Sequence, residues 1–290
     1  MRLCTWITNV TTNPKHNSQK YFLLACTLIF YMPNAQTKFQ LIDSHCHLDF
    51  EIFDRDREQV LQRAKNQHIT DIIIPGTESR YWQRILKLCN NQNLHACYGL
   101  HPYWINSHTK KDLTKLDHYI DDNKPVAIGE CGLDFRPQQA NKEVQIEYYE
   151  AQLDIAAHHQ LPVVIHSVKA TESIIKSIKK HKNLTGMVHS FSGSVEQAKK
   201  LIDLNFYIGI SGSVTYDSAK KMRAVANAIP ITSLLLETDS PDQADSKNKN
   251  NRNEPAYLIN TLDTITELRE ETREKIALQT TLNTKRLFNI

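Results

Sequence analysis

The feature that most constrains the fold of this chain is a regular alternation of apolar runs and amphipathic segments, which begins near residue 40. Short runs rich in aliphatic and β-branched residues occupy positions 41–49, 71–76, 95–102, 125–134, 162–168, 185–193, 206–214 and 234–241. Between them, apolar residues recur at helical spacing over 55–67, 81–89, 143–157, 171–182, 195–204, 218–229 and 255–268. This alternation predicts a parallel sheet whose strands are connected by helices.

Eight predicted strands within residues 40–290 match a (β/α)8 TIM barrel, an α/β fold of about 250 residues. A doubly wound open sheet is the alternative. It is disfavoured because no glycine-rich phosphate loop follows the first strand, and the chain has only eight glycines. We therefore expect one TIM-barrel domain over 40–290, without internal repeats.

Residues 1–39 differ from the rest of the chain. They contain four basic residues and no acidic one. The mostly apolar run from Tyr21 to Met32 resembles the core of a signal peptide but is too short to span a bilayer comfortably. We expect a short extension that is disordered or mis-started, with Met32 as an alternative start. A cleaved signal peptide and a membrane anchor are the other interpretations.

The balance of charge limits the kind of partner. With 35 Lys and Arg against 32 Asp and Glu, the formal net charge is +3. Without the four basic residues of 1–39 the balance is 31 against 32, or −1. A body this close to neutral is unlike a high-affinity, non-specific DNA binder, so phosphate binding requires a local site. The six cysteines form no C-x-x-C pair, which indicates reduced thiols and a cytoplasmic location.

Most of the predicted strands end in side chains that can bind metals. In a TIM barrel, all these strand ends meet at one rim. An apolar run that stops on His, Glu or Asp leaves a costly polar group at the edge of the core unless that group has a partner. The pattern therefore predicts a metal site at the rim. Its candidate residues are His45, His47, His101, Glu130, His166, His189 and Asp239.

This set of ligands also indicates a type of chemistry. It exceeds what one tetrahedral ion needs and suits two divalent ions with a bridging carboxylate. Mixed nitrogen and oxygen ligands are compatible with Zn, Mn or Mg. Two such ions can activate a water molecule and stabilise both the attacking and the leaving oxygens of a phosphodiester.

Seven segments, taken together, resemble the TatD family of metal-dependent deoxyribonucleases. They are DSHCHLD at 43–49, GLHP at 99–102, IGECGLD at 128–134, VIH at 164–166, HSFSGS at 189–194, ETDSP at 237–241 and RNEP at 252–255. The resemblance covers roughly residues 40–290 and includes NTKRLF at 283–288, in the last helix of the family. It implies a TIM barrel related to the amidohydrolases and a metal-dependent DNase, often one that trims 3′ ends.

The resemblance also implies roles for individual residues. The first ion would be held by His45, His47 and Asp239, the second by His166 and His189, and Glu130 would bridge both. Asp239 would also act as the general base. His101 would orient the phosphate or protonate the leaving group, or else only hydrogen-bond a ligand. Asp134 and Asp49 would orient ligating imidazoles.

Two cations are candidates for substrate binding. Arg252 would contact the DNA, or else pair with Glu254. Two positions after the histidine of the fifth strand, the family usually has an arginine, and this chain has Val168. Lys169 is the candidate to supply that charge, although lysine cannot grip a phosphate with two parallel hydrogen bonds as arginine can. This departure from the family's pattern leaves the metal site intact and bears on substrate preference or rate.

We expect DNA as the substrate, no membrane association of the barrel and no obligate protein partner. Two other functions fit the same features. A hydrolase of a small amide or phosphoester would use the same metal centre and would leave DNA intact. A metal-stabilised barrel without catalysis would bind metal and hydrolyse nothing.

Overall fold

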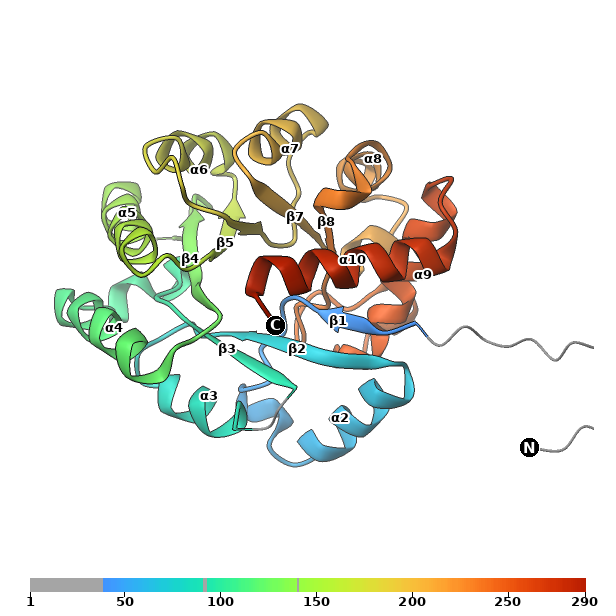
Figure 1. Ribbon diagram of the computed structural model, residues 1–290, viewed down its shortest axis with the longest axis horizontal. Coiled ribbons are helices and arrows are strands. Elements are labelled where there is room, and N and C mark those ends of the chain that lie inside the picture. The colour runs from blue at the N-terminus through green and yellow to red at the C-terminus, as the bar shows by residue number, and fades with distance from the viewer. Residues whose placement is uncertain (1–38, 91–92, 140) are drawn as a thin grey trace, which may run out of the picture. The chain divides into compact units, whose positions relative to one another are not determined.

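The computed structural model describes residues 39–290, leaving aside 91–92 and 140. Apart from its last residue, the extension expected over 1–39 lies outside the described residues, so its nature and its boundary stay predictions. In the described part, eight strands pair side by side in chain order, and all neighbouring pairs are parallel. Figure 1 shows a ring of helices around these strands.

The strands close into a barrel. Ser44, just after β1, joins the first strand to the last, because its amide and its hydroxyl both donate to the carbonyl oxygen of Leu236, at 3.0 and 2.9 Å. The predicted (β/α)8 TIM barrel is therefore confirmed. The strands are β1 Leu41–Asp43, β2 Ile69–Pro75, β3 Leu94–Tyr98, β4 Ala127–Asp134, β5 Val163–Val168, β6 Gly186–Val188, β7 Phe206–Ile210 and β8 Leu234–Leu236.

The helices follow the strands in turn. They are α2 Arg57–Asn66, α3 Trp82–Leu88, α4 Lys110–Asn123, α5 Lys142–His159, α6 Thr171–Ile178, α7 Val195–Ile202, α8 Lys220–Ala228, α9 Leu258–Leu268 and α10 Arg273–Phe288. All seven predicted helical segments contain a helix. No helix is predicted over 110–123, where α4 lies, because only Leu116 and Ile120 are buried among its fourteen mostly polar residues. Its start is fixed by a capping box of Thr109 and Asp112.

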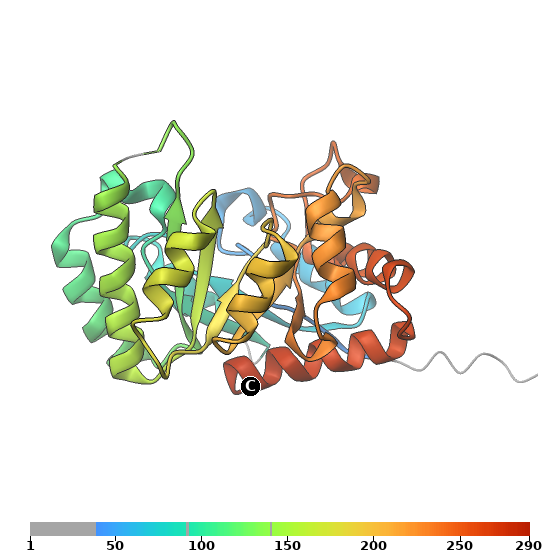
Figure 2. The same cartoon turned by 90° about the horizontal axis from the view of Figure 1, so that it is seen from above.

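The barrel interior is closed at one end by the last helix. A buried cluster inside the barrel takes one side chain from each of six strands: Ile73, Cys97, Ala127, Val164, Met187 and Leu235. Leu287 and Phe288 of α10 belong to the same cluster. In Figure 2, α10 (red) lies across this end of the barrel, while long loops project at the opposite end. The carboxyl ends of the strands, and hence the predicted site, lie at that opposite end.

Two further findings bear on the sequence-based expectations. Across residues 39–290, with the three undescribed positions set aside, no helix is both long enough and apolar enough to cross a bilayer. The described cysteines, Cys46, Cys89, Cys97 and Cys131, are all free thiols.

Candidate metal centre

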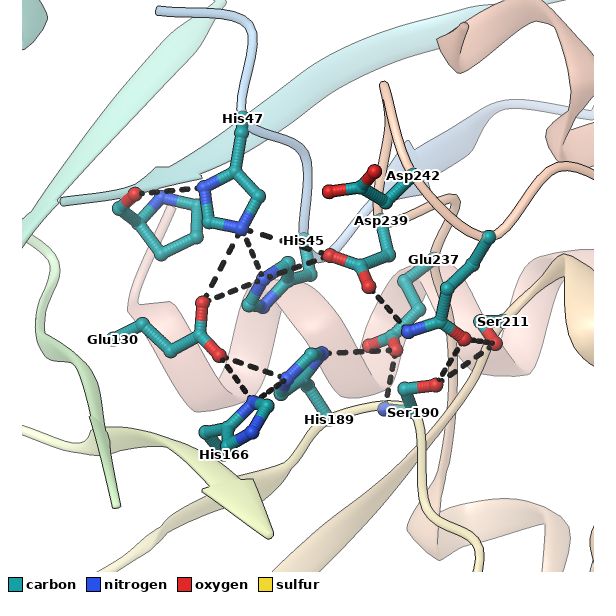
Figure 3. Close-up of polar contacts among 12 residues, drawn as sticks. His45, His47, Glu130, His166, His189, Ser190, Ser211, Glu237, Asp239 and Asp242 are labelled. Carbon is teal, nitrogen blue, oxygen red and sulfur yellow. Dashed lines mark hydrogen bonds and ion pairs between the residues drawn. The ribbon is translucent and has the colours of Figure 1, made fainter. Parts of the chain in front are cut away.

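The ends of five strands bring the predicted ligands to one spot. His45 and His47 follow β1, Glu130 lies in β4, His166 in β5, and His189 and Asp239 follow β6 and β8. Figure 3 shows Glu130 between two pairs of imidazoles, with His45 and His47 on one side and His166 and His189 on the other. The expectation that side chains two apart share one face of an extended segment holds for His45 and His47, whose Nε2 atoms are 3.2 Å apart.

Glu130 reaches this position through an irregularity of β4. The register between β4 and β5 shifts between Ile128 and Cys131, where β4 advances three residues while β5 advances two. A bulge of this kind redirects a side chain and is common next to active sites. Two positions on, Gly132 is paired with His166 at a φ of +135°, and a Cβ there would collide with the carbonyl oxygen of His166. Glycine therefore allows the close approach of the two strands that carry Glu130 and His166.

The first group of ligand atoms has the dimensions of a metal site. Glu130 Oε2 lies 3.2 Å from His45 Nε2 and 3.3 Å from His47 Nε2. Asp239 Oδ1 lies 3.4 and 3.6 Å from the same two nitrogens. Ligands bound tetrahedrally at about 2.0–2.1 Å from an ion are about 3.3–3.4 Å apart, which is the spacing seen here.

The second group is built around the other oxygen of Glu130. Its Oε1 lies 3.0 Å from His166 Nδ1 and 2.8 Å from His189 Nε2, and these two nitrogens are 3.2 Å apart. His101 Nε2 approaches the same oxygen to 2.9 Å. The two groups are continuous, because the rings of His45 and His189 stack with their centroids 4.0 Å apart.

An oxygen atom lies behind three of the imidazoles, and behind His47 it makes a hydrogen bond. His47 Nδ1 lies 3.3 Å from the carbonyl oxygen of Pro75, His166 Nε2 lies 3.4 Å from Asp134 Oδ2, and His189 Nδ1 lies 3.6 Å from Glu237 Oε1. The outer nitrogens of His166 and His189 have no hydrogen-bond partner among the described residues. A proton on each outer nitrogen would leave a lone pair on the inner one, as in metal-binding histidines. Asp134 lies next to the outer nitrogen of His166 and also pairs with Arg136, and its orienting role stays a prediction.

His101 has the opposite tautomer. Its Nδ1 accepts a hydrogen bond from the amide of Tyr103 at 2.9 Å, so the proton of the neutral ring lies on Nε2 and points to Glu130 Oε1. Burial, the largest influence, lowers the pKa of His101 to about 4, which keeps the ring neutral near pH 7. His101 thus faces the centre as a donor rather than as a lone-pair ligand, as the sequence-based prediction has it.

The electrostatics of the centre favour a bound cation. Glu130 Oε2 is buried without a hydrogen-bond partner among the described residues, which is costly for a carboxylate unless a cation is present. Burial alone would lower the pKa of His47, yet the neighbouring Glu130 and Asp239 raise it to about 9. Burial raises the pKa of Glu130, but the imidazoles around it outweigh that effect and hold it well below its ordinary value. The residues therefore fit a divalent metal ion.

Asp239 lies at the end of β8 in a left-handed backbone conformation, with φ at +58°. Its Oδ1 faces the first group, and its Oδ2 accepts a hydrogen bond from Gln243 Nε2. Burial raises the pKa of Asp239 to about 6. Ligation and proton transfer by this carboxylate stay predictions that the geometry allows.

Three residues of the site are missed by reasoning from the sequence. Asp43 accepts hydrogen bonds from the amide and hydroxyl of Thr238, at 2.9 and 2.5 Å, and ties β1 to the segment that carries Asp239. Glu237 accepts from the amide of Ser190 and lies behind His189. Gln243 holds Asp239. The signal for Asp43 and Glu237 was present, since both lie in segments that resemble the family, but Gln243 has no such signal.

Three other expected residues lie away from the two groups of ligand atoms. Asp49 does not orient a ligand: its Oδ1 has no hydrogen-bond partner among the described residues, and Pro75 lies behind His47 instead. Arg252 donates to both oxygens of Asp56, at 2.8 and 2.7 Å, and lies 3.8 Å from Glu254. Lys169 is exposed just after β5, so substrate contact by Arg252 or Lys169 stays a prediction.

A cavity of about 550 Å³ opens beside the second group. His166 and His189 line it, together with Lys220 and Lys221 at the start of α8. Ser190, Ser213 and Gln243 also line it. This volume is in the range of about 300–1,000 Å³ that ligand sites commonly have.

Comparisons with known proteins agree with this description. A family model described as "TatD related DNase" matches residues 42–289. The uncharacterized metal-dependent hydrolase YjjV of Escherichia coli K12 is 38% identical over 255 residues, which are 87% of this chain and 98% of that protein. The uncharacterized metal-dependent hydrolase YabD of Bacillus subtilis is 36% identical over 253 residues, which are 86% of this chain and 99% of that protein.

Solved structures show the same relationship. The crystal structure of E. coli YjjV, described as a TatD homolog, matches with a TM-score of 0.84 at 36% identity, over 87% of this chain and 99% of that one. A TatD family hydrolase from Entamoeba histolytica shares the fold, with a TM-score of 0.77 at 24% identity over 86% and 98% of the two chains.

Proposed function

Because this chain belongs to the family of TatD-related DNases and is a metal-dependent hydrolase of the TatD type, we propose that it cleaves phosphodiester bonds of DNA, as a 3′–5′ exonuclease that uses two divalent ions. The observation that carries this proposal is the position of Glu130. Each of its two oxygens faces a separate pair of imidazoles. A carboxylate so placed suits the bridge between two ions.

In this proposal His45, His47 and Asp239 hold one ion, and His166 and His189 hold the other. The bound ions supply Lewis acidity at the phosphoryl group and lower the pKa of a water molecule. The imidazole-rich environment suits Zn or Mn better than Mg, and all three are candidates.

The side chains supply the proton transfers. Asp239, with its pKa raised to about 6 by burial, accepts a proton from the attacking water as general base near neutral pH. His101 is neutral and presents its Nε2–H toward Glu130 at the edge of the second group. From there it donates a hydrogen bond to a phosphate oxygen or to the leaving oxygen.

The test is cleavage of single-stranded DNA labelled at its 3′ end. We expect the wild type to release the label in the presence of Mg, Mn or Zn and to stop when EDTA is added. Glu130→Gln keeps the size of the side chain but removes the charge, and it should lose activity by at least about a hundredfold. Glu58→Gln, the same change on the exposed face of α2, is the control. Metal-loaded wild type that leaves DNA intact would overturn the proposal.

One observation favours a second candidate. The cavity of about 550 Å³ matches a small-molecule site in size, which fits a hydrolase of a small amide or phosphoester. Metal-dependent cleavage of a small phosphodiester by a protein that does not cut DNA would decide for this candidate. We expect the protein to cleave both DNA and the small phosphodiester.

A further inference from the structure

We infer that the cavity between the second ligand group and α8 binds a second phosphate of the substrate, next to the one that is cleaved. This inference rests on the proposed function and specifies its substrate: a molecule with two phosphates a nucleotide apart. Most of its residues come from the end of β5, the segment after β6 and the start of α8.

The charges in the cavity fit an anion. No carboxylate of a described residue lines it. Its two cations, Lys220 and Lys221, have no ion-pair partner among the described residues. Three lysines elsewhere on the barrel do have such a partner: Lys110 pairs with Glu147, Lys180 with Glu150 and Lys200 with Glu172. The lysines of the cavity therefore keep their charge available for a ligand.

The hydroxyl groups of the cavity fall into two sets. Ser190 and Ser213 donate to Gln243 Oε1, at 2.5 and 3.0 Å, and Ser167 Oγ lies 3.3 Å from Thr171 Oγ1, so these three hydroxyls already have partners. Ser192 and Ser218 line the same cavity, and their hydroxyls have no partner among the described side chains and backbone. These two hydroxyls can donate to phosphate oxygens.

The start of α8 adds backbone donors. Ala219 is its N-cap and offers no capping side chain, and the first turn has no acidic residue. The amide of Lys220 donates to the carbonyl oxygen of Ser218, and no described group accepts from the amides of Lys221 and Met222. Both residues line the cavity, so their amides add to the lysine charges rather than standing alone.

Val168, which stands where the family usually has an arginine, agrees with a phosphate site in this cavity. Val168 lines the cavity where the resemblance leads one to expect an arginine, and Lys169 is not among the lining residues. The lysine charge of the cavity therefore comes from the start of α8 instead of from the end of β5. A phosphate bound in the cavity contacts Lys220 and Lys221.

The test compares two substrates that differ in the second phosphate. One is a short single-stranded oligothymidylate, and the other is bis(p-nitrophenyl) phosphate, which has one phosphate only. For the double variant Lys220→Met/Lys221→Met, we expect the KM for the oligonucleotide to rise about tenfold relative to the KM for the small diester. The dependence of the oligonucleotide KM on salt should also weaken, by about 0.7 in logarithmic slope for one lost phosphate contact.

The matched control is Lys199→Met/Lys200→Met, which removes the same charge from the last turn of α7. An unchanged ratio of the two KM values in the cavity variant would overturn the inference. So would an equal change in the control variant.

Binding of thymidine 3′,5′-bisphosphate, measured by calorimetry, separates this inference from the proposed function. If neither substrate is cleaved but the bisphosphate binds tenfold more weakly to the cavity variant, the cavity takes phosphate from a small molecule and the nuclease proposal fails. If both substrates are cleaved and the lysine variant binds the bisphosphate as the wild type does, only the cavity inference fails. No cleavage and no binding reject both.

Discussion

Single side chains decide the geometry of the metal centre, and Gln243 shows how. Its Oε1 accepts hydrogen bonds from the hydroxyls of Ser190, Ser211 and Ser213, at 2.5, 2.9 and 3.0 Å. This fixes the orientation of the amide, because a flipped amide would turn its oxygen toward the carboxylate of Asp239. Nε2 therefore donates to Asp239 Oδ2 and leaves Oδ1 for the first ligand group.

The variant Gln243→Met keeps the length of the side chain and removes the donor. Loss of a hydrogen bond to a metal ligand commonly lowers metal affinity or activity by 10- to 100-fold. We expect kcat or the affinity for the first ion to fall by about that factor while KM changes little. Metal titration together with steady-state kinetics measures both, and Gln62→Met on the exposed face of α2 is the control. Full metal affinity with unchanged kcat would show that Gln243 does not position Asp239.

At the scale of single residues, the sequence predicts the metal ligands better than the residues that hydrogen-bond to those ligands. The ligands stand at the ends of apolar strands, where a charged residue is conspicuous. The partners of Gln243 come from the ends of β6 and β7, about 30 to 50 residues away along the chain. A helical or strand period carries no information about such a contact, so only the three-dimensional arrangement reveals it.

At the scale of elements, α2 is bound to the segment after β8 by two crossed ion pairs. Arg252 donates to Asp56, and Arg63 donates to both oxygens of Glu254, at 2.7 and 2.6 Å. Between them, the buried side chain of Asn253 donates to the carbonyl oxygens of Thr238 and Asp242, on either side of Asp239. These contacts connect the position of α2 to the segment that carries Asp239.

Hydrogen bonds from Arg252, and then from Arg63, lower the pKa of Asp56 to about 2. A carboxylate with a lowered pKa stabilises the fold above its unfolded pKa of about 3.9, and this stabilisation is lost as the pH falls from about 4 to 2. Since Asp56 is partly exposed, we expect Asp56→Asn to cost only about 1 kcal/mol at pH 7, or about 2–4 °C in Tm.

Unfolding by urea at several pH values measures this effect. The difference between wild type and Asp56→Asn should narrow as the pH drops from 4 toward 2. Asp203→Asn, at the exposed end of α7, should behave as the wild type at all pH values. A difference that is the same at pH 7 and at pH 2 would mean that Asp56 acts through packing and not through its charge.

The sequence predicts an element accurately where its apolar residues follow a regular pattern, and less accurately where they do not. The apolar stripe of α7 is regular, and its position is confirmed. The strands are shorter than their apolar runs; β6, for example, covers only Gly186–Val188. The residues beyond it bend into the rim, where Ser190 has a left-handed backbone and a hydrogen bond to Glu237. Apolar composition cannot distinguish a strand from the rim loop that follows it.

At the scale of the whole molecule, metal binding should stabilise the barrel. Ligands from the ends of β1, β4, β5, β6 and β8 meet at the centre, so an ion held there joins distant parts of the chain. An ion present at about a hundred times its Kd adds about 2.7 kcal/mol to the free energy of unfolding. For a protein of this size that corresponds to about 5–10 °C in Tm.

Scanning calorimetry with excess Mn or Zn, and again with EDTA, checks this expectation. The shift should be much smaller in Glu130→Gln, which lacks the bridging charge. An equal shift in both proteins would place the stabilising ion somewhere else. The barrel itself was predictable because eight apolar runs recur at barrel spacing; the cavity beside α8 was not, because its walls come from loops of irregular sequence.

The presence of two ions on Glu130 is the claim on which the proposed chemistry depends most, and counting the ions tests it. Isothermal titration of metal-free protein with Mn or Zn should give two sites per chain. Glu130→Gln should lose at least one of them, while Glu58→Gln should keep both. A single site in the wild type, or two sites that remain in Glu130→Gln, would contradict the bridged centre.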